Sequence, residues 1–228
     1  MTDLSQQRQQ ILSRMQQASQ AVARAVNSVT LLAVSKYQSV DAIRQVYADG
    51  QRAFGENYVQ EALLKQQALA DLAIEWHFIG QVQRNKTRDL AAGFAWVHGV
   101  DREVIAERLS AQRPLDQPPL NLCLQVNVDD EETKGGCHPS ALPQLVAQIS
   151  QLPQIRLRGL MVIPARDSTP AFAQTQQWFE ALRCHHACPD DWDTLSMGMS
   201  ADLESAIAHG ATLVRVGTAL FGERVRAS

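Results

Sequence analysis

Residues 29–72 read VTLLAVSKYQSVDAIRQVYADGQRAFGENYVQEALLKQQALADL, and this stretch contains the repeating unit of the fold. It begins with a short apolar run (29–35), which is followed by a helix-like stretch (40–50). A second apolar run (52–55) and a second helix-like stretch (57–72) then repeat the pattern. Short apolar runs bounded by turns are typical of buried parallel strands, so the stretch predicts two strand–helix units in succession.

The same alternation continues along the rest of the chain. Six more apolar runs predict strands: EWHFIG (75–80), WVHGV (96–100), LNLCLQVNV (120–128), IRLRGLMVI (155–163), TLSMG (194–198) and TLVRVG (212–217). About eight strands alternating with about eight helices predict an α/β fold, a single (β/α)8 TIM-type barrel that forms one domain over residues 1–228. The alternative is an open doubly wound sheet, which would want a glycine-rich phosphate turn after its first strand. Here that strand ends in SKYQS, which contains no glycine.

Residues 4–27 precede this alternation. Their apolar positions have the spacing of an amphipathic helix: Leu4, Ile11, Leu12, Met15, Val22 and Val26. We expect an extra N-terminal helix that covers the floor of the barrel, with contact to a partner as the alternative.

The composition argues against several classes of function. The 228 residues are 45% hydrophobic and carry a net charge of −3, with a pI near 6.1. No basic patch dominates, so nucleic acid and membrane surfaces are not expected partners. The polar, Gln-rich start lacks the apolar core of a signal peptide, and no later apolar run is long enough to span a bilayer. We therefore expect a cytoplasmic protein, and a monomer.

The segment RCHHAC (183–188) offers two thiols and two imidazoles. A metal site is one interpretation, and the end of a surface helix is the other. Structural zinc sites usually take paired ligand clusters from two segments, and no second cluster is visible. We therefore favour the helix end and predict no metal.

The carboxyl ends of the strands form the active face of such a barrel, and Lys36 directly follows the first strand. Burial against apolar walls disfavours the ammonium form, and the neutral amine is the form that attacks a carbonyl carbon. The other interpretation is a lysine that extends its charged end into solvent at the end of a strand. Position alone does not separate the two.

The last two strands predict a phosphate site. Gly217 and Thr218 follow the last strand just before a short helix, and Ser200 has the position of an N-cap in SMGMSADLE (196–204). Barrels often bind phosphate at these loops, on backbone N–H groups at a helix N-terminus. An ordinary cap and an ordinary glycine turn are the alternative.

Arg215 lies inside the last strand, between two valines. A charge there is costly unless it is paired or faces a ligand, so the choice is between a salt bridge inside the barrel and a ligand contact. A guanidinium only donates hydrogen bonds. Beside a pyridine nitrogen it would keep that nitrogen unprotonated, which weakens the ring as an electron sink.

Three other residues are candidates near the strand ends. Asn57 follows the second strand and is well placed to contact a ligand. His77 stands within the third strand, where a lone histidine is more often a hydrogen-bonded core residue. Met161 could pack beside a ring at the mouth of the barrel or belong to the core.

Together these motifs resemble the pyridoxal-phosphate homeostasis protein family, which is related in fold to the N-terminal barrel of alanine racemase. The resembling segments are LLAVSK, GQRAFGENYVQE, EWHFIGQVQRNK, LRGLMVIPA, DTLSMGMSADLESAI and TLVRVGTALFG. The resemblance implies that Lys36 forms a Schiff base (an aldimine) with pyridoxal 5′-phosphate (PLP). It also implies that Ser200, Gly217 and Thr218 hold the phosphate and that Arg215 faces the ring nitrogen. Asn57, Met199 and His77 are implied to line the pocket.

The resemblance further implies a non-catalytic PLP carrier that serves vitamin B6 homeostasis, with PLP-dependent apo-enzymes as recipients. The alternative is a PLP-dependent amino-acid racemase, which needs an acid or base on each face of the substrate carbon. In alanine racemase a tyrosine of a second domain serves one face, and we expect that domain to be absent because few residues follow the last glycine. A third interpretation is a Schiff-base aldolase that binds a sugar phosphate and no chromophore.

Overall fold

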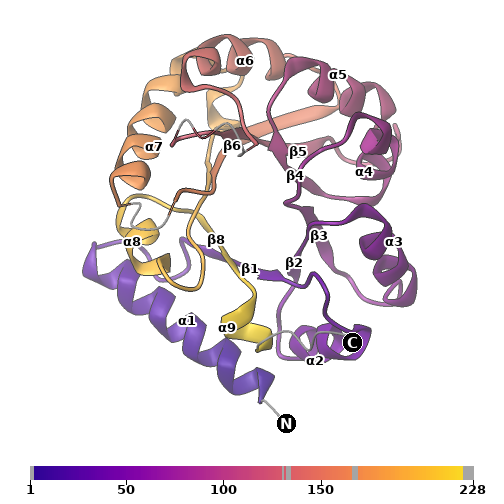
Figure 1. Cartoon of the computed structure of the whole chain (residues 1–228), viewed down its shortest axis with the longest axis vertical. Coiled ribbons are helices and arrows are strands. Elements are labelled where there is room, and N and C mark those ends of the chain that lie inside the picture. The colour runs from indigo at the N-terminus through magenta and orange to yellow at the C-terminus, as the bar shows by residue number, and fades with distance from the viewer. Residues whose placement is uncertain (1–2, 130, 132–134, 166–168, 223–228) are drawn as a thin grey trace.

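The computed structural model describes residues 3–129, 131, 135–165 and 169–222, and it confirms the predicted barrel. Parallel strands close into a ring in chain order, and the first pairs with the last (Figure 1). The strands are β1 (Thr30–Val34), β2 (Ala53–Glu56), β3 (Glu75–Phe78), β4 (Trp96–Val100), β5 (Leu120–Val126), β6 (Ile155–Val162), β7 (Thr194–Ser196) and β8 (Leu213–Val216). Each lies within a run that the sequence predicted, apart from one residue at the end of β2.

Helices connect the strands and surround the barrel (Figure 1). In chain order they are α1 (Leu4–Ala21), α2 (Val40–Ala48), α3 (Val59–Ala68), α4 (Thr87–Gly93), α5 (Glu103–Gln112), α6 (Leu142–Ile149), α7 (Thr169–Leu182), α8 (Leu203–Ala208) and α9 (Thr218–Phe221). The segment 183–188 follows the end of α7, as favoured from the sequence, and the described residues contain no group of three or more metal-binding side chains.

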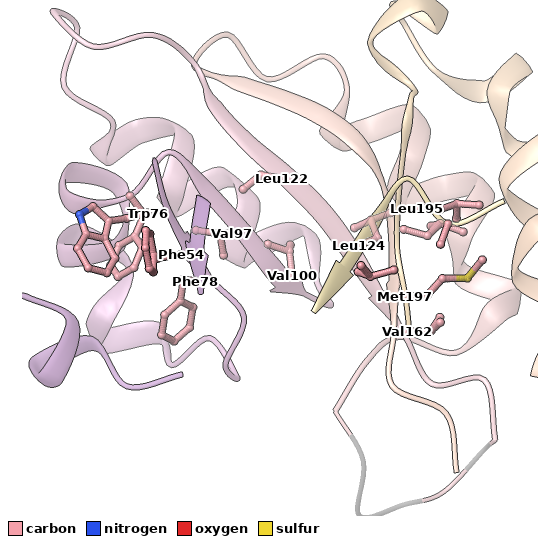
Figure 2. Packing of buried hydrophobic residues seen from close by; sticks show 14 of the residues in the cluster. Phe54, Trp76, Phe78, Val97, Val100, Leu122, Leu124, Val162, Leu195 and Met197 are labelled. Atoms are coloured by element: carbon pink, nitrogen blue, oxygen red, sulfur yellow. The ribbon is translucent and has the colours of Figure 1, made fainter. Parts of the chain in front are cut away.

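The main apolar core lies between the strands and the surrounding helices. Figure 2 shows part of it, including Phe54, Trp76 and Phe78 from the neighbouring strands β2 and β3. The rings of Phe54 and Trp76 are 6.1 Å apart. Because side chains alternate along a strand, the residues next to these three in β2 and β3 face the barrel interior.

The barrel interior is partly polar. Two small apolar clusters lie inside it, one around Leu32 and Ile79 and the other formed by Trp96, Cys123 and Met161. Buried polar side chains occupy other inward positions of the strands: His77, His98, Ser196 and Arg215. Such groups are costly unless they are hydrogen-bonded, and all four have partners.

The expectation that the N-terminal helix covers the barrel floor is wrong. Helix α1 packs against α8, α9 and α2 on the outside of the barrel (Figure 1). In the described part of the chain, α9 spans only four residues and leaves room beside β8 that a longer eighth helix would take. The buried face of α1, with Ile11 and Met15, fills that place.

No helix in the described part of the chain is both long and apolar enough to cross a membrane.

Candidate functional site

A cavity of about 350 Å³ opens at the carboxyl ends of the strands. Seven of the residues that the sequence singled out line it together: Lys36, Asn57, Met199, Ser200, Arg215, Gly217 and Thr218. They come from the ends of β1, β2, β7 and β8 and from the loops that follow. The remaining wall includes apolar side chains of Val34, Ile79 and Ile163, which the rule of strand ends could also have identified.

The backbone on both sides of Lys36 is held in place. The preceding Ser35 is buried, its N–H donates to Gly55 O over 2.9 Å, and its hydroxyl donates to Glu56 Oε1 over 2.6 Å. The following Tyr37 adopts a left-handed conformation with φ of 63°, and its N–H donates to Glu61 Oε1 over 2.5 Å. These contacts fix the point from which the Lys36 side chain extends into the cavity.

A second lysine pairs with two carboxylates behind this strand end. Lys65 Nζ donates to Glu56 Oε1 at 2.8 Å, to Glu61 Oε1 at 2.6 Å and to the carbonyl oxygen of Ser35 at 2.7 Å. Burial raises the pKa of Glu56, and the adjacent Lys65 ammonium opposes this shift. Oxygen Oε2 of Glu56 has no hydrogen-bond partner among the described residues.

Arg215 is the most unusual charge of the site, because its guanidinium is buried and only 4% of the residue is exposed. Nη1 donates to the carbonyl oxygen of Ser196 at 2.6 Å and to its hydroxyl at 2.8 Å, and Nη2 donates to Val162 O at 2.7 Å. No carboxylate forms a salt bridge with it in the described part of the chain, so the alternative of a salt bridge inside the barrel is wrong. Burial lowers the pKa of Arg215 to about 10, which leaves it protonated at pH 7.

Two of the five N–H groups of this guanidinium have no acceptor among the described residues. The three hydrogen bonds above use both N–H groups of Nη1 and one of Nη2. One N–H on Nη2 and the N–H on Nε remain within the described residues. Because Arg215 lines the cavity, a ligand with an acceptor atom can satisfy a cation that the fold leaves partly unsatisfied.

The end of the cavity near β8 offers backbone donors. Gly217 is the N-cap of α9, and the first N–H groups of such a helix have no intrahelical acceptor. Ser200 lies beside them but is not the N-cap of α8, which was wrongly expected. That helix begins at Leu203, and Asp202 folds the loop back by accepting from Met199 N at 2.6 Å. The Ser200 side chain therefore caps no helix.

Asn57 and Met199 complete the rim of the cavity. The side-chain oxygen of Asn57 is buried and has no hydrogen-bond partner in the described residues. Met199 is 39% exposed at the mouth. A buried amide oxygen without a partner is costly, so this position also favours a polar ligand.

His77 does not lie with the other seven residues, and its expected place beside the ligand cavity is wrong. It lines a different cavity at the amino ends of the strands, together with Glu75 and Trp96. Its Nε2 lies 2.8 Å from Glu75 Oε1, and its Nδ1 lies 2.9 Å from His98 Nε2. Met161 is also absent from the mouth, because it is fully buried among the interior side chains.

The chain is similar to known proteins over almost its whole length. The sequence model of the family "Alanine racemase, N-terminal domain" matches residues 9–225. A pyridoxal phosphate homeostasis protein of Pseudomonas aeruginosa is 52% identical over 227 residues, which cover 98% of this chain and 97% of that protein. The protein of the same name from Escherichia coli K12 is 44% identical, with 98% of each chain covered.

Solved structures show the same architecture. PipY of Synechococcus elongatus, whose structure is described as having PLP bound, superposes with a TM-score of 0.79 at 40% identity. The alignment covers 93% of this chain and all of PipY. Alanine racemase of Corynebacterium glutamicum has a TM-score of 0.66 at 15% identity, and the match covers 95% of this chain and 62% of the racemase. That second likeness concerns the fold alone.

Proposed function

The chain belongs to the alanine racemase N-terminal domain family and, within it, to the pyridoxal phosphate homeostasis proteins, and we propose that it binds PLP through a Schiff base with Lys36. We further propose that it acts as a carrier of this cofactor without catalytic turnover. PLP binding by PipY, a 40% identical relative, supports the ligand. The names of the relatives support the role in homeostasis.

The observation that carries the proposal is the pairing of Lys36 with Arg215 in one cavity. PLP supplies an aldehyde, a phosphate and a ring nitrogen, and when bound it acts as an electron sink. Lys36 offers the amine for the aldehyde. The backbone of Gly217 and Thr218, with Ser200 beside it, offers donors for the phosphate. Arg215 has two N–H groups left for an acceptor such as the ring nitrogen.

The side chains around the cavity favour a carrier over a racemase. Among the described residues that line it, Lys36 and Arg215 are the only ionisable ones. Racemisation requires an acid or base on each face of the substrate carbon, and an arginine that stays protonated is a poor second base. Tyr58, the nearby tyrosine, is 48% exposed, contacts the ring of Tyr37 and does not line the cavity.

Borohydride reduction of the purified protein with PLP tests the attachment. The protein should be yellow, and reduction should bleach it. The reduced cofactor, which serves as the label, should then stay covalently attached to the peptide that contains Lys36. Lys86→Ala is the matched control, because that lysine lines a neighbouring cavity and not this one, and it should keep the label. A colourless protein that takes up no PLP would refute the proposal, and labelling by a sugar phosphate would indicate the aldolase instead.

Two further measurements separate the carrier from the racemase. Stereoinversion of an amino acid at an appreciable rate would favour the racemase. Transfer of PLP from the protein to the apo-form of a PLP-dependent enzyme would favour the carrier. We propose a cytoplasmic monomer in this role, which size-exclusion chromatography with light scattering tests for its oligomeric part.

A further inference from the structure

A row of hydrogen bonds crosses the barrel interior from the ligand cavity to the floor. We name its five residues the interior chain: Arg215, Ser196, His98, His77 and Glu75. Arg215 Nη1 lies 2.8 Å from Ser196 Oγ, which lies 2.9 Å from His98 Nδ1. His98 Nε2 lies 2.9 Å from His77 Nδ1, and His77 Nε2 lies 2.8 Å from Glu75 Oε1. The five residues come from four different strands.

The interior chain is shielded along its length and reaches a cavity at each end. His98 and Ser196 are fully buried, and His77 and Arg215 are nearly so. Arg215 lines the ligand cavity, whereas Glu75 lines the cavity at the amino ends of the strands. The indole of Trp96 stacks flat on the His77 ring, with centroids 5.3 Å apart and an angle of 6° between the planes. That packing fixes the plane of the imidazole.

The Glu75 carboxylate and the neutral rings of the two buried histidines set the direction of the hydrogen bonds in the interior chain. An ionised carboxylate only accepts hydrogen bonds, so His77 carries its proton on Nε2 and, as a neutral ring, accepts on Nδ1. His98 then carries its proton on Nε2 and donates to His77 Nδ1. The neutral His98 ring therefore accepts on Nδ1 from the Ser196 hydroxyl, whose oxygen accepts from the donor-only guanidinium of Arg215. Each group thus donates toward the floor, and the row ends on the one member that is a carboxylate.

Both histidines are neutral in this arrangement. Each neutral ring offers one donor and one acceptor, as these directions require. Burial lowers the pKa of His77 and lowers that of His98 well below its ordinary value, and the Arg215 charge adds to the effect on His98. The burial and the hydrogen-bond directions therefore agree.

We propose that His98 and His77 are positioning residues for Arg215, which they hold through Ser196 with its remaining N–H groups toward the ligand cavity. Glu75 supplies a distant negative charge for a guanidinium that has no salt-bridge partner in the described part of the chain. The part of this inference that concerns PLP rests on the proposed function. The directions of the hydrogen bonds do not, because they follow from the unliganded geometry.

Nitrogen-15 NMR of the histidine rings in the unliganded protein tests the directions. His77 and His98 should both be neutral, with the proton on Nε2, and should stay so down to about pH 6, near which an ordinary histidine takes up a proton. His98→Phe assigns one set of signals by removing it. A proton on Nδ1 of either ring, or a doubly protonated ring at neutral pH, would overturn the proposal.

The ring nitrogen of PLP labelled with nitrogen-15 tests the effect on the ligand. Ser196→Ala and His98→Phe should both shift its resonance and speed PLP dissociation by about tenfold, the size expected for one lost polar contact. Ser196→Thr restores the hydroxyl and should restore the signal. The matched control is His186→Phe. His186 is also buried, but its hydrogen bonds are with Leu157 O and Cys188 N, which lie outside the interior chain.

The outcomes distinguish the two proposals. If the wild type binds PLP but the resonance and the dissociation rate are unchanged in both disrupting variants, the positioning role is refuted and the proposed function stands. If the wild type takes up no PLP, the proposed function fails, and the ring protons in the unliganded protein still test the hydrogen-bond directions of the interior chain.

Glu75→Gln gives a third variant for the case in which Ser196→Ala and His98→Phe do not fold. Its half-exposed amide can still accept from His77, so a changed resonance on loss of the charge alone supports the proposal, and an unchanged one opposes it.

Discussion

Lys65 is a buried cation whose acceptors all lie in the wall behind Lys36. Its three hydrogen bonds go to Glu56, Glu61 and the carbonyl of Ser35. The ammonium has three donors, and the structure uses all of them. The buried carboxylate of Glu56 is tolerated because this lysine is next to it. Loss of the lysine leaves that carboxylate without its ionic partner, so the free energy of unfolding should fall by more than the attraction between the pair contributes.

Lys65→Met should therefore lower the free energy of unfolding by about 3–5 kcal/mol at neutral pH, the usual cost of removing one partner of a buried pair. Burial raises the pKa of Glu56 in the folded protein. A raised folded pKa gives stability that is present below the ordinary carboxyl pKa and lost as the pH rises. The deficit of Lys65→Met should thus shrink in acid, which urea unfolding at several pH values measures. Adding Glu56→Gln should recover part of the loss, and a deficit of constant size at every pH would contradict the explanation.

The contrast between Asn57 and His77 shows how far single residues could be placed from the sequence. Asn57 could be placed because it follows a strand, and the ends of parallel strands meet at one face. His77 faces inward, as its strand predicts, but inward residues of one strand stack at successive heights. Ile79, two residues later on that side of the barrel, lines the ligand cavity, whereas His77 lies near the floor. Only the register between strands gives this height, and the sequence does not state the register.

The elements were predicted more completely than their packing. All eight strands appear where apolar runs predicted them, because burial on both faces gives each run a clear boundary. The position of α1 could not be predicted in the same way. Its apolar face shows that it must pack somewhere, but its place depends on the shortness of α9, which leaves room beside β8.

Helix α1 also contacts the loop that carries Ser200. Arg14 forms a two-pronged ion pair with Glu204, at 2.7 and 2.9 Å, and its Nη2 donates to Ser200 O at 3.0 Å. Both side chains of the pair are exposed by a third or more, so the pair itself should contribute less than about 1 kcal/mol to stability. The contact with Ser200 O instead supports the wall of the ligand cavity.

Arg14→Ala should therefore change stability little and speed PLP dissociation about fivefold, which corresponds to one surface contact of roughly 1 kcal/mol. Glu204→Ala is the matched variant, because it removes the ion pair and leaves Arg14 able to donate to Ser200 O. Its dissociation rate should stay closer to the wild type. Stopped-flow measurement of PLP release and urea unfolding provide both values, and equal rates for the two variants would argue against a role of the Ser200 contact.

Strand β4 makes stability depend on pH through His98. Burial lowers the pKa of His98 well below 6.5 in the folded protein, so the unfolded chain binds a proton more readily. A lowered folded pKa gives stability that is present above the ordinary pKa and lost as the pH falls below it. The free energy of unfolding should therefore decline from pH 6.5 downward, by up to about 1.4 kcal/mol per pH unit for this one proton.

His98→Gln removes this titration and should flatten the decline, although it lowers stability at neutral pH. Chemical unfolding between neutral and mildly acid pH measures the slope for each protein. His138→Gln is the control, because His138 lies on the exposed surface and its loss should leave the slope unchanged. If His98→Gln keeps the full slope of the wild type, the decline has another source.

Across the whole molecule, α1 closes a ring of helices that the strand–helix repeats leave open. The barrel supplies a helix after each strand, but the last of them spans only four of the described residues. Helix α1 contacts the helices on both sides of this gap and buries Leu4, Ile11 and Met15. A segment that precedes the first strand in sequence thereby joins the first and last repeats in space (Figure 1).

Ile11→Ala should accordingly destabilise the entire barrel and not α1 alone. Ile11 is 2% exposed, and deletion of a buried aliphatic side chain usually costs about 2–5 kcal/mol. Leu64→Ala is the matched control, because Leu64 lies on a helix with 70% exposure and its loss should change stability by less than about 0.5 kcal/mol. Tryptophan fluorescence reports Trp76 and Trp96 in the strands together with Trp178 and Trp192, and none of the four lies in α1. This signal and circular dichroism should give one common transition for Ile11→Ala, shifted to lower urea. Loss of helical signal before any change in fluorescence would instead show that α1 is a separable addition to a ring that is stable without it.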